Sequence, residues 1–121
     1  MTVPIELSNF FLAMQAGKPG AGRLEACFAD DAIYEEPFSG SPMVHEGKAA
    51  IMQAMSRGWE PAPMPDMHIQ VDHAETKGTE IHVRWTCFSP AIPGGSGKGL
   101  NRFEMRDGLI VKLTTTLEDM T

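Results

Sequence analysis

Three segments of the chain place apolar residues at intervals of three and four, the spacing that predicts amphipathic helices. The first segment begins near Thr2, a common helix-capping residue type, and stops at Gly17. The other two predicted helices lie at residues 22–28 and 48–57. The apolar positions of the first helix are Ile5, Leu7, Phe10, Phe11 and Met14.

After residue 66 the apolar period changes to two, which predicts strands. Residues 67–75 and 79–88 form one predicted hairpin, and a second hairpin pairs the strand around Phe103 with the strand around Leu113. A shorter strand is predicted at residues 32–36, because the residue before a proline favours extended geometry. Loops are predicted at residues 38–46, 59–66 and 89–99. This order of elements predicts an α+β fold, a curved sheet with helices on one face.

Matching apolar faces predicts the register of the first hairpin, because a slip of one residue would turn an apolar set toward water. Val71 is then opposite Trp85 on the inner face. Asp72 is opposite Arg84 on the outer face, and His73 points inward.

The same argument pairs Met105 with Val111 and Asn101 with Thr115 in the last hairpin. Asn101 then lies on the apolar face of its strand. Buried amides are nearly always hydrogen-bonded, so a buried Asn101 needs polar partners. The alternative is a solvated asparagine at the start of the strand.

Composition and charge limit the partners. The 121 residues suffice for one domain with a single core, residues 1–121. A formal charge of −6 argues against nucleic acids and anionic membranes, which bind basic surfaces, and no segment has the length of a membrane span. Cys27 and Cys87 lie in apolar runs, which favours buried free thiols in a reducing compartment over a disulfide. We expect a cytoplasmic protein.

Two adjacent carboxylates, Glu35 and Glu36, come directly before Pro37. Side chains alternate between the faces of a strand, so one of the two must point inward. If Tyr34 and Glu36 share the inner face with Ala32, burial can raise the affinity of Glu36 for a proton and make it a general base or acid. The alternative is that both glutamates are solvated at the strand end.

The segment from Phe28 to Ile51 resembles the ketosteroid isomerase branch of the nuclear-transport-factor-2-like superfamily, which also contains the SnoaL-like polyketide cyclases. The shared features are the run Phe-Ala-Asp-Asp-Ala, a carboxylate directly before a proline, and the later Gly-Lys-Ala-Ala-Ile. The resemblance implies a cone-shaped, barrel-like fold of cystatin-like topology. In such a fold a curved, mostly antiparallel sheet wraps around N-terminal helices and encloses an apolar pocket.

The resemblance also implies roles for single residues. The family's catalytic base stands before the proline, which corresponds to Glu36. A protonated aspartate of the family corresponds to Asn101, whose amide is a permanent neutral donor. A helix tyrosine of the family corresponds to Phe10, which cannot donate a hydrogen bond. The other candidate pocket residues are Met14, Tyr34, Met52, Met55, Trp85, Phe103 and Thr115.

Three functions remain open at this point. The first is proton transfer next to a carbonyl group of a hydrophobic ketone, steroid-like or polyketide-like, with Glu36 as base and Asn101 as donor. The second is a SnoaL-like cyclase, a dehydratase or an epoxide hydrolase. The third is a non-catalytic domain that binds a small hydrophobic ligand. We expect a homodimer and no cofactor in each case.

The remaining motifs in the sequence do not predict a function. The glycine-rich run Pro93–Gly99 lacks a serine or threonine after its lysine and leads into a strand, so it does not predict a phosphate-binding loop. The histidines have no metal-ligand spacing, and we expect no metal. No serine or cysteine has the context of a nucleophile.

Overall fold

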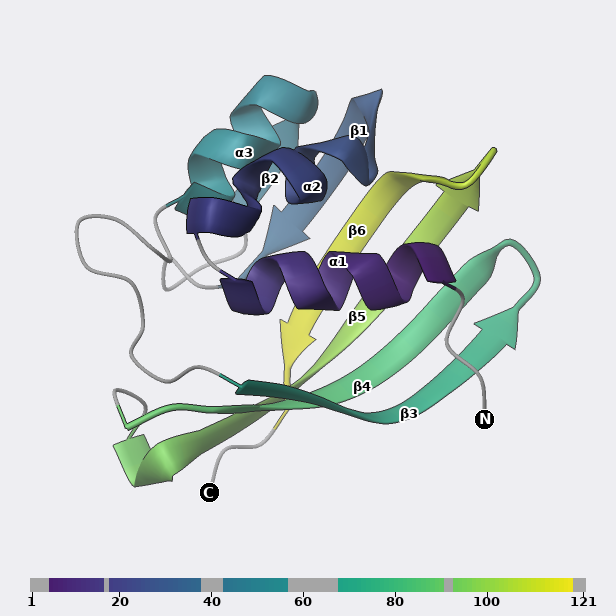
Figure 1. Cartoon of the computed structure of the whole chain (residues 1–121). Coiled ribbons are helices and arrows are strands. Elements are labelled where there is room, and N and C mark those ends of the chain that lie inside the picture. The colour runs from purple at the N-terminus through teal and green to yellow at the C-terminus, as the bar shows by residue number, and fades with distance from the viewer. Residues whose placement is uncertain (1–4, 17, 38–42, 57–67, 91–92, 119–121) are drawn as a thin grey trace.

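The computed structural model describes residues 5–16, 18–37, 43–56, 68–90 and 93–118 of the chain. Helical elements precede and interrupt the strands along the chain (Figure 1). The elements are α1 (Ile5–Ala16), η1 (Lys18–Gly20), α2 (Ala21–Ala26), β1 (Phe28–Glu36), β2 (Met43–Glu46), α3 (Lys48–Ser56), β3 (His68–Lys77), β4 (Glu80–Phe88), η2 (Pro93–Gly95), β5 (Ser96–Arg106) and β6 (Leu109–Leu117).

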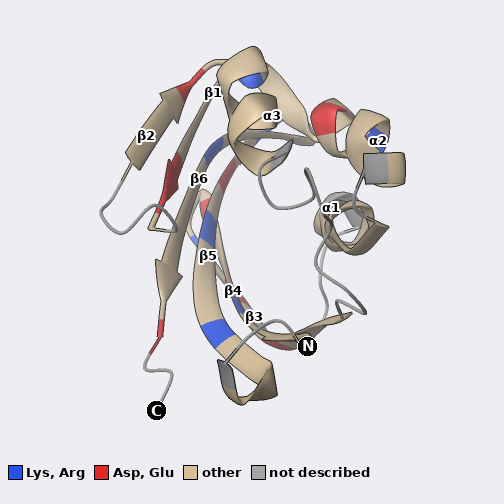
Figure 2. Cartoon of the chain, turned by 90° about the vertical axis from the view of Figure 1, so that its left-hand side faces the viewer, with Lys and Arg blue, Asp and Glu red and all other residues tan. Residues whose placement is uncertain are grey.

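The six strands form one sheet in the order β2-β1-β6-β5-β4-β3. Neighbouring strands are antiparallel except β1 and β6, which are parallel. The sheet is curved and does not close into a barrel, and α1, α2 and α3 lie on its concave side (Figure 2). The predicted fold class, a curved sheet wrapped around N-terminal helices, is therefore confirmed.

The core lies between α1 and the sheet. Phe10 is 2% exposed, and its ring meets those of Phe11, Phe28 and Phe103 edge to face, with centroids 5.2 to 6.1 Å apart. Edge-to-face contacts are favourable arrangements of aromatic rings. This cluster holds α1 across the middle of the sheet.

The predicted registers hold close to the centres of both hairpins. Val71 pairs with Trp85, and Asn101 pairs with Thr115. The last hairpin turns at Asp107, with φ of 54°, and Gly108, with φ of 79°. Two positive φ values are the requirement of a two-residue type I′ turn, which Asp-Gly satisfies.

Bulges change the registers away from those centres. Asp72 is an extra residue in β3, so His73 rather than Asp72 pairs with Arg84. The predicted inward position of His73 is therefore wrong: His73 is exposed, and Ala74 takes the inner face.

The bulge has local polar support, because Thr86 Oγ1 donates to Asp72 Oδ2 at 2.5 Å and Gln70 Nε2 donates to Oδ1 at 2.6 Å. These two hydrogen bonds lower the pKa of Asp72.

A second bulge in the last hairpin pairs Met105 with Ile110 instead of Val111. The glycine-rich connection also ends earlier than predicted, because β5 begins at Ser96 and Gly99 pairs with Trp85. The positions of bulges and strand ends depend on the partner strand, so the apolar pattern of one strand alone does not predict them.

The strand β2 is missing from the prediction, which placed a loop at residues 38–46. Met43 and Val44 are both exposed, so this strand has no apolar alternation, and pairing with β1 defines it. The predicted strand at residues 32–36 begins earlier, at Phe28, because α2 ends at Ala26. The predicted capping by Thr2, the end of the third helix at residue 57 and the loop at residues 59–66 lie outside the described residues.

Cys27 and Cys87 are free thiols, as expected, but each is only partly buried. Their partial burial raises the pKa of both thiols. Among the helices in the described part of the chain, none is long and apolar enough to cross a membrane.

Candidate functional site

Glu36 lies on the inner face of β1. Ala32, Tyr34 and Glu36 are all buried, which confirms the predicted alternation, and Glu36 is 5% exposed. Its Oε2 atom lies 3.0 Å from Nε2 of His45. A carboxylate can only accept hydrogen bonds, so the proton between an ionised Glu36 and His45 is on Nε2.

The hairpin of β1 and β2 places His45 beside this carboxylate. Tyr34 pairs directly with His45, and the two rings lie 5.8 Å apart at 33°. His45 was not predicted as a site residue because β2 was predicted as a loop. The available local signal was weak, a single β-branched residue, Val44, between Pro42 and Gly47.

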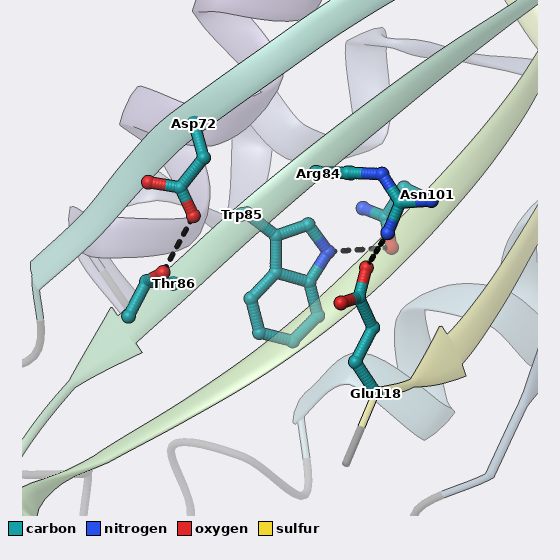
Figure 3. Close-up of polar contacts among 6 residues, drawn as sticks. All are labelled: Asp72, Arg84, Trp85, Thr86, Asn101 and Glu118. Carbon is teal, nitrogen blue, oxygen red and sulfur yellow. Dashed lines mark hydrogen bonds and ion pairs between the residues drawn. The ribbon is translucent and has the colours of Figure 1, made fainter. Parts of the chain in front are cut away.

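Asn101 is buried and hydrogen-bonded, as expected for an amide on the inner face. Its Oδ1 atom accepts from Trp85 Nε1 at 3.0 Å (Figure 3). It also accepts from Thr115 Oγ1 at 2.8 Å. An indole N–H can only donate, so the amide atom that faces Trp85 must be the oxygen. Both lone pairs of Oδ1 are used by these two donors, which leaves the NH₂ group of Asn101 as the group that can donate to a ligand.

Tyr34 continues this hydrogen-bonded row. Its hydroxyl is hydrogen-bonded to the side chain of Thr115. The Thr115 proton is already donated to Asn101, so this bond uses the proton of Tyr34. Burial and the nearby Glu36 carboxylate raise the pKa of Tyr34 well above its ordinary value. Tyr34 is therefore neutral at physiological pH.

The polar residues of the inner face thus come from five neighbouring strands. Glu36 and Tyr34 on β1 have His45 on one side, from β2, and Thr115 on the other, from β6. Asn101 on β5 and Trp85 on β4 follow in the same order. All of these residues except His45 were among the candidate site residues predicted from the sequence.

The apolar candidate residues are buried to different depths. Phe10, Phe103 and Met55 are buried in the core cluster, and Met14 and Met52 are partly buried against it. Whether they line a ligand pocket stays a prediction.

Comparison with known proteins identifies the family. The model of the SnoaL-like domain family matches residues 7–113. The chain belongs to the SnoaL-like domain family. The SnoaL-like and ketosteroid isomerase-like resemblance of the segment around Glu36 is therefore confirmed at the level of the superfamily. A search of curated proteins found no match.

Solved structures share the fold of this SnoaL-like domain. A protein described as a polyketide cyclase, from Sinorhizobium meliloti, has 21% identity and a TM-score of 0.77, over 94% of this chain and 95% of its own. One described as a ketosteroid isomerase, from Kribbella flavida, has 17% identity and a TM-score of 0.73, over 97% and 78%. An epoxide hydrolase of M. tuberculosis has 17% identity and a TM-score of 0.70, over 94% and 80%. At these identities the likeness shows the fold and not the reaction.

The charged residues of this SnoaL-like domain lie mainly away from the row. Arg84 is exposed and forms an ion pair with Glu118 (Figure 3). Arg102 and Arg106 are also exposed. Within the described residues, no three His, Cys, Asp or Glu side chains are grouped so that they could hold a metal ion.

Proposed function

We propose that this SnoaL-like domain is an enzyme that moves a proton next to the carbonyl group of a hydrophobic ketone. Glu36 is the general base, and the Asn101 amide donates a hydrogen bond to the oxygen that becomes negative. The observation that supports this most is that the inner face carries both a buried carboxylate, Glu36, and a buried amide, Asn101. The amide oxygen of Asn101 already accepts two hydrogen bonds from the protein. One accepts a proton and the other donates a hydrogen bond, as enolisation requires.

The spacing of the strands supports the same division of roles. Glu36 and Asn101 are on β1 and β5, which are separated by β6. Neighbouring strands are about 4.8 Å apart, so the two backbones are separated by roughly 10 Å. A flat ketone between the two side chains can present a C–H bond to the carboxylate and its oxygen to the amide.

The proton balance of the reaction is simple. Glu36 removes the proton from the carbon beside the carbonyl, and the C–H electron pair moves into the enolate, whose oxygen accepts a bond from Asn101 Nδ2–H. Glu36 then returns the proton to the same carbon or to the far end of the conjugated system. His45 holds Oε2 of Glu36 throughout and orients the carboxylate.

The oxyanion donor differs from the tyrosine expected in the family. Phe10 has no hydroxyl, and the Tyr34 proton is directed to Thr115. The proposal therefore uses the single neutral donor Asn101. Removing one donor from such a site typically costs about 2.7–4 kcal/mol of transition-state stabilisation, so we expect slower turnover than a two-donor site would give.

An epoxide hydrolase is the less favoured alternative. The epoxide hydrolases of this superfamily usually have an arginine and two aspartates in the pocket, and each arginine that the structure describes here is exposed. A cyclase or dehydratase would use the same base and donor as the ketone reaction. The proposal also includes the homodimer and the cytoplasmic location expected from the sequence. The outer sheet face, where Arg102 and Thr114 line a shallow depression, is the surface proposed for the second subunit.

The experiment is hydrogen exchange in heavy water with a panel of β,γ-unsaturated and aromatic polycyclic ketones. We expect wild type to introduce deuterium beside the carbonyl and Glu36→Gln to lose this activity, because the amide is not a base. Binding of the same ketones with no exchange in either protein would replace this function with that of a ligand-binding domain.

A further inference from the structure

We propose that Trp85 is the positioning residue that fixes the direction of the Asn101 amide, so that the site accepts ligands with a hydrogen-bond acceptor and disfavours ligands that only donate. This inference rests on the proposed function for the identity of the ligand group. It concerns a residue that touches the donor and not the reacting carbon.

An asparagine side chain can point its oxygen or its nitrogen in a given direction with almost the same shape. Its partners decide between the two orientations. Around Asn101 the two partners of Oδ1 are Trp85 and Thr115.

Trp85 and Thr115 differ in which orientation of the Asn101 amide they allow. The Thr115 hydroxyl can rotate, and it can donate to an amide oxygen or accept from an amide nitrogen. The Trp85 indole can only donate, so it is compatible with the oxygen alone. Trp85 is thus the partner that selects the orientation, whereas Thr115 can follow either one.

Gly99 provides the place where the indole lies. Gly99 pairs with Trp85 across β4 and β5, two residues before Asn101 on the same face. A Cβ atom on Gly99 would lie 2.7 Å from Cη2 and 2.8 Å from Cε2 of the indole, closer than real Cβ contacts. Only glycine at this position lets the ring lie across β5 with its N–H directed at Asn101.

The amide orientation has a consequence for ligand recognition. With Oδ1 occupied, the site offers N–H donors to a ketone or enolate oxygen. If the amide turned over, it would offer an oxygen instead and favour an ammonium or another donor. Trp85 therefore contributes specificity without touching the reacting atoms.

The test compares two variants that each remove one hydrogen bond to the same oxygen. Trp85→Phe keeps a ring over Gly99 and loses the N–H, whereas Thr115→Val loses the hydroxyl. The probes are 2-tetralone, which only accepts at its oxygen, and the 2-aminotetralin cation, which only donates from the same carbon frame. The measured quantity is the ratio of their dissociation constants.

We expect Trp85→Phe to shift this ratio by about tenfold toward the cation, and Thr115→Val to leave it within about twofold of wild type. The carbonyl stretch of bound 2-tetralone should move to higher frequency in Trp85→Phe only, because the ketone loses its donor. Equal shifts in both variants would mean that the hydrogen bonds are interchangeable, and would overturn the proposal.

A measurement without ligand separates this inference from the proposed function. Trp59 and Trp85 are the two tryptophans of the chain, so Trp59→Phe assigns the Trp85 indole N–H signal in an NMR spectrum. Solvent exchange of this proton should be slow in wild type and at least tenfold faster in Asn101→Leu. That result with no 2-tetralone binding would reject the proposed function and support the orientation of Asn101. Equal exchange in both proteins would reject the orientation, even if ketones react.

Discussion

Nε2 of His45 lies 3.0 Å from Oε2 of Glu36, with the Glu36 side chain buried on the inner face of the sheet and His45 partly buried beside it. A base that must take a proton from a fixed carbon needs a fixed direction, and a displacement of about 1 Å can cost up to roughly a hundredfold in rate. We therefore expect His45→Leu to lower the rate of ketone hydrogen exchange by about ten- to a hundredfold.

His45→Gln is the matched control, because glutamine retains an N–H donor that can reach the carboxylate. We expect it to keep most of the exchange rate and to differ from wild type mainly in KM. The measurement is the exchange rate at a series of ketone concentrations, which separates kcat from KM. Equal losses of kcat in the two variants would show that the imidazole contributes more than an oriented N–H.

Gly99 and Gly22 give a pair of glycine substitutions with opposite expectations. Gly99→Ala places a methyl group against the Trp85 indole, so the ring must move and the protein should lose about 1–3 kcal/mol of its free energy of unfolding. Gly22→Ala lies in α2 with nothing within 4 Å of the new atom, and should stabilise by up to about 1 kcal/mol. Urea unfolding measures both, and a harmless Gly99→Ala would contradict the close approach of the indole.

Phe10 and Leu12 compare a buried and an exposed side chain of the same helix. Phe10 is 2% exposed within the aromatic cluster, and Leu12 is 61% exposed. Phe10→Ala should cost about 3–5 kcal/mol in the free energy of unfolding, because it leaves a cavity among the aromatic rings, whereas Leu12→Ala should change it by less than about 0.5 kcal/mol. The midpoints of thermal or urea unfolding would be compared, and similar losses would mean that Leu12 is covered in solution.

The regular alternation of apolar and polar residues predicted the faces of the strands and the central registers of the hairpins. Period-two alternation offered inward positions for Glu36 and Asn101, with a solvated strand end as the alternative for each, and the structure has the inward positions. Pairing Asn101 with Thr115 followed from the same rule. These predictions held because each rested on several apolar residues whose faces had to agree.

The predictions failed where a neighbour decides the structure. The bulge at Asp72 turned His73 outward, and no residue of β3 alone indicates an extra residue there. The strand that contains His45 has exposed apolar residues on both faces, so its pairing with β1 is a tertiary effect. The Trp85–Asn101 contact likewise depends on Gly99. Glycine has no side chain, so the alternation of apolar residues does not indicate that an indole lies over this position.

Tyr34 provides a prediction that needs no ligand, since it is the single tyrosine of the chain. Burial and the Glu36 carboxylate raise the pKa of Tyr34 above its ordinary value, so the folded protein retains the phenol proton at a pH where the unfolded chain loses it. The unfolded chain ionises near pH 10. The phenolate absorbance should therefore appear at about pH 10 in concentrated urea and remain absent at pH 10–11 in the folded protein.

The same shift predicts how stability depends on pH. Below pH 10 both the folded and the unfolded state hold the phenol proton, so Tyr34 does not make the free energy of unfolding depend on pH. Above pH 10 the unfolded state binds fewer protons than the folded state, so the free energy of unfolding should fall, by up to about 1.4 kcal/mol per pH unit from this group. Tyr34→Phe removes this contribution, and its urea midpoint should decline less steeply than that of wild type between pH 10 and 11. Parallel declines would show that the Tyr34 hydroxyl is open to solvent and does not hold the hydrogen-bonded row that ends at Asn101.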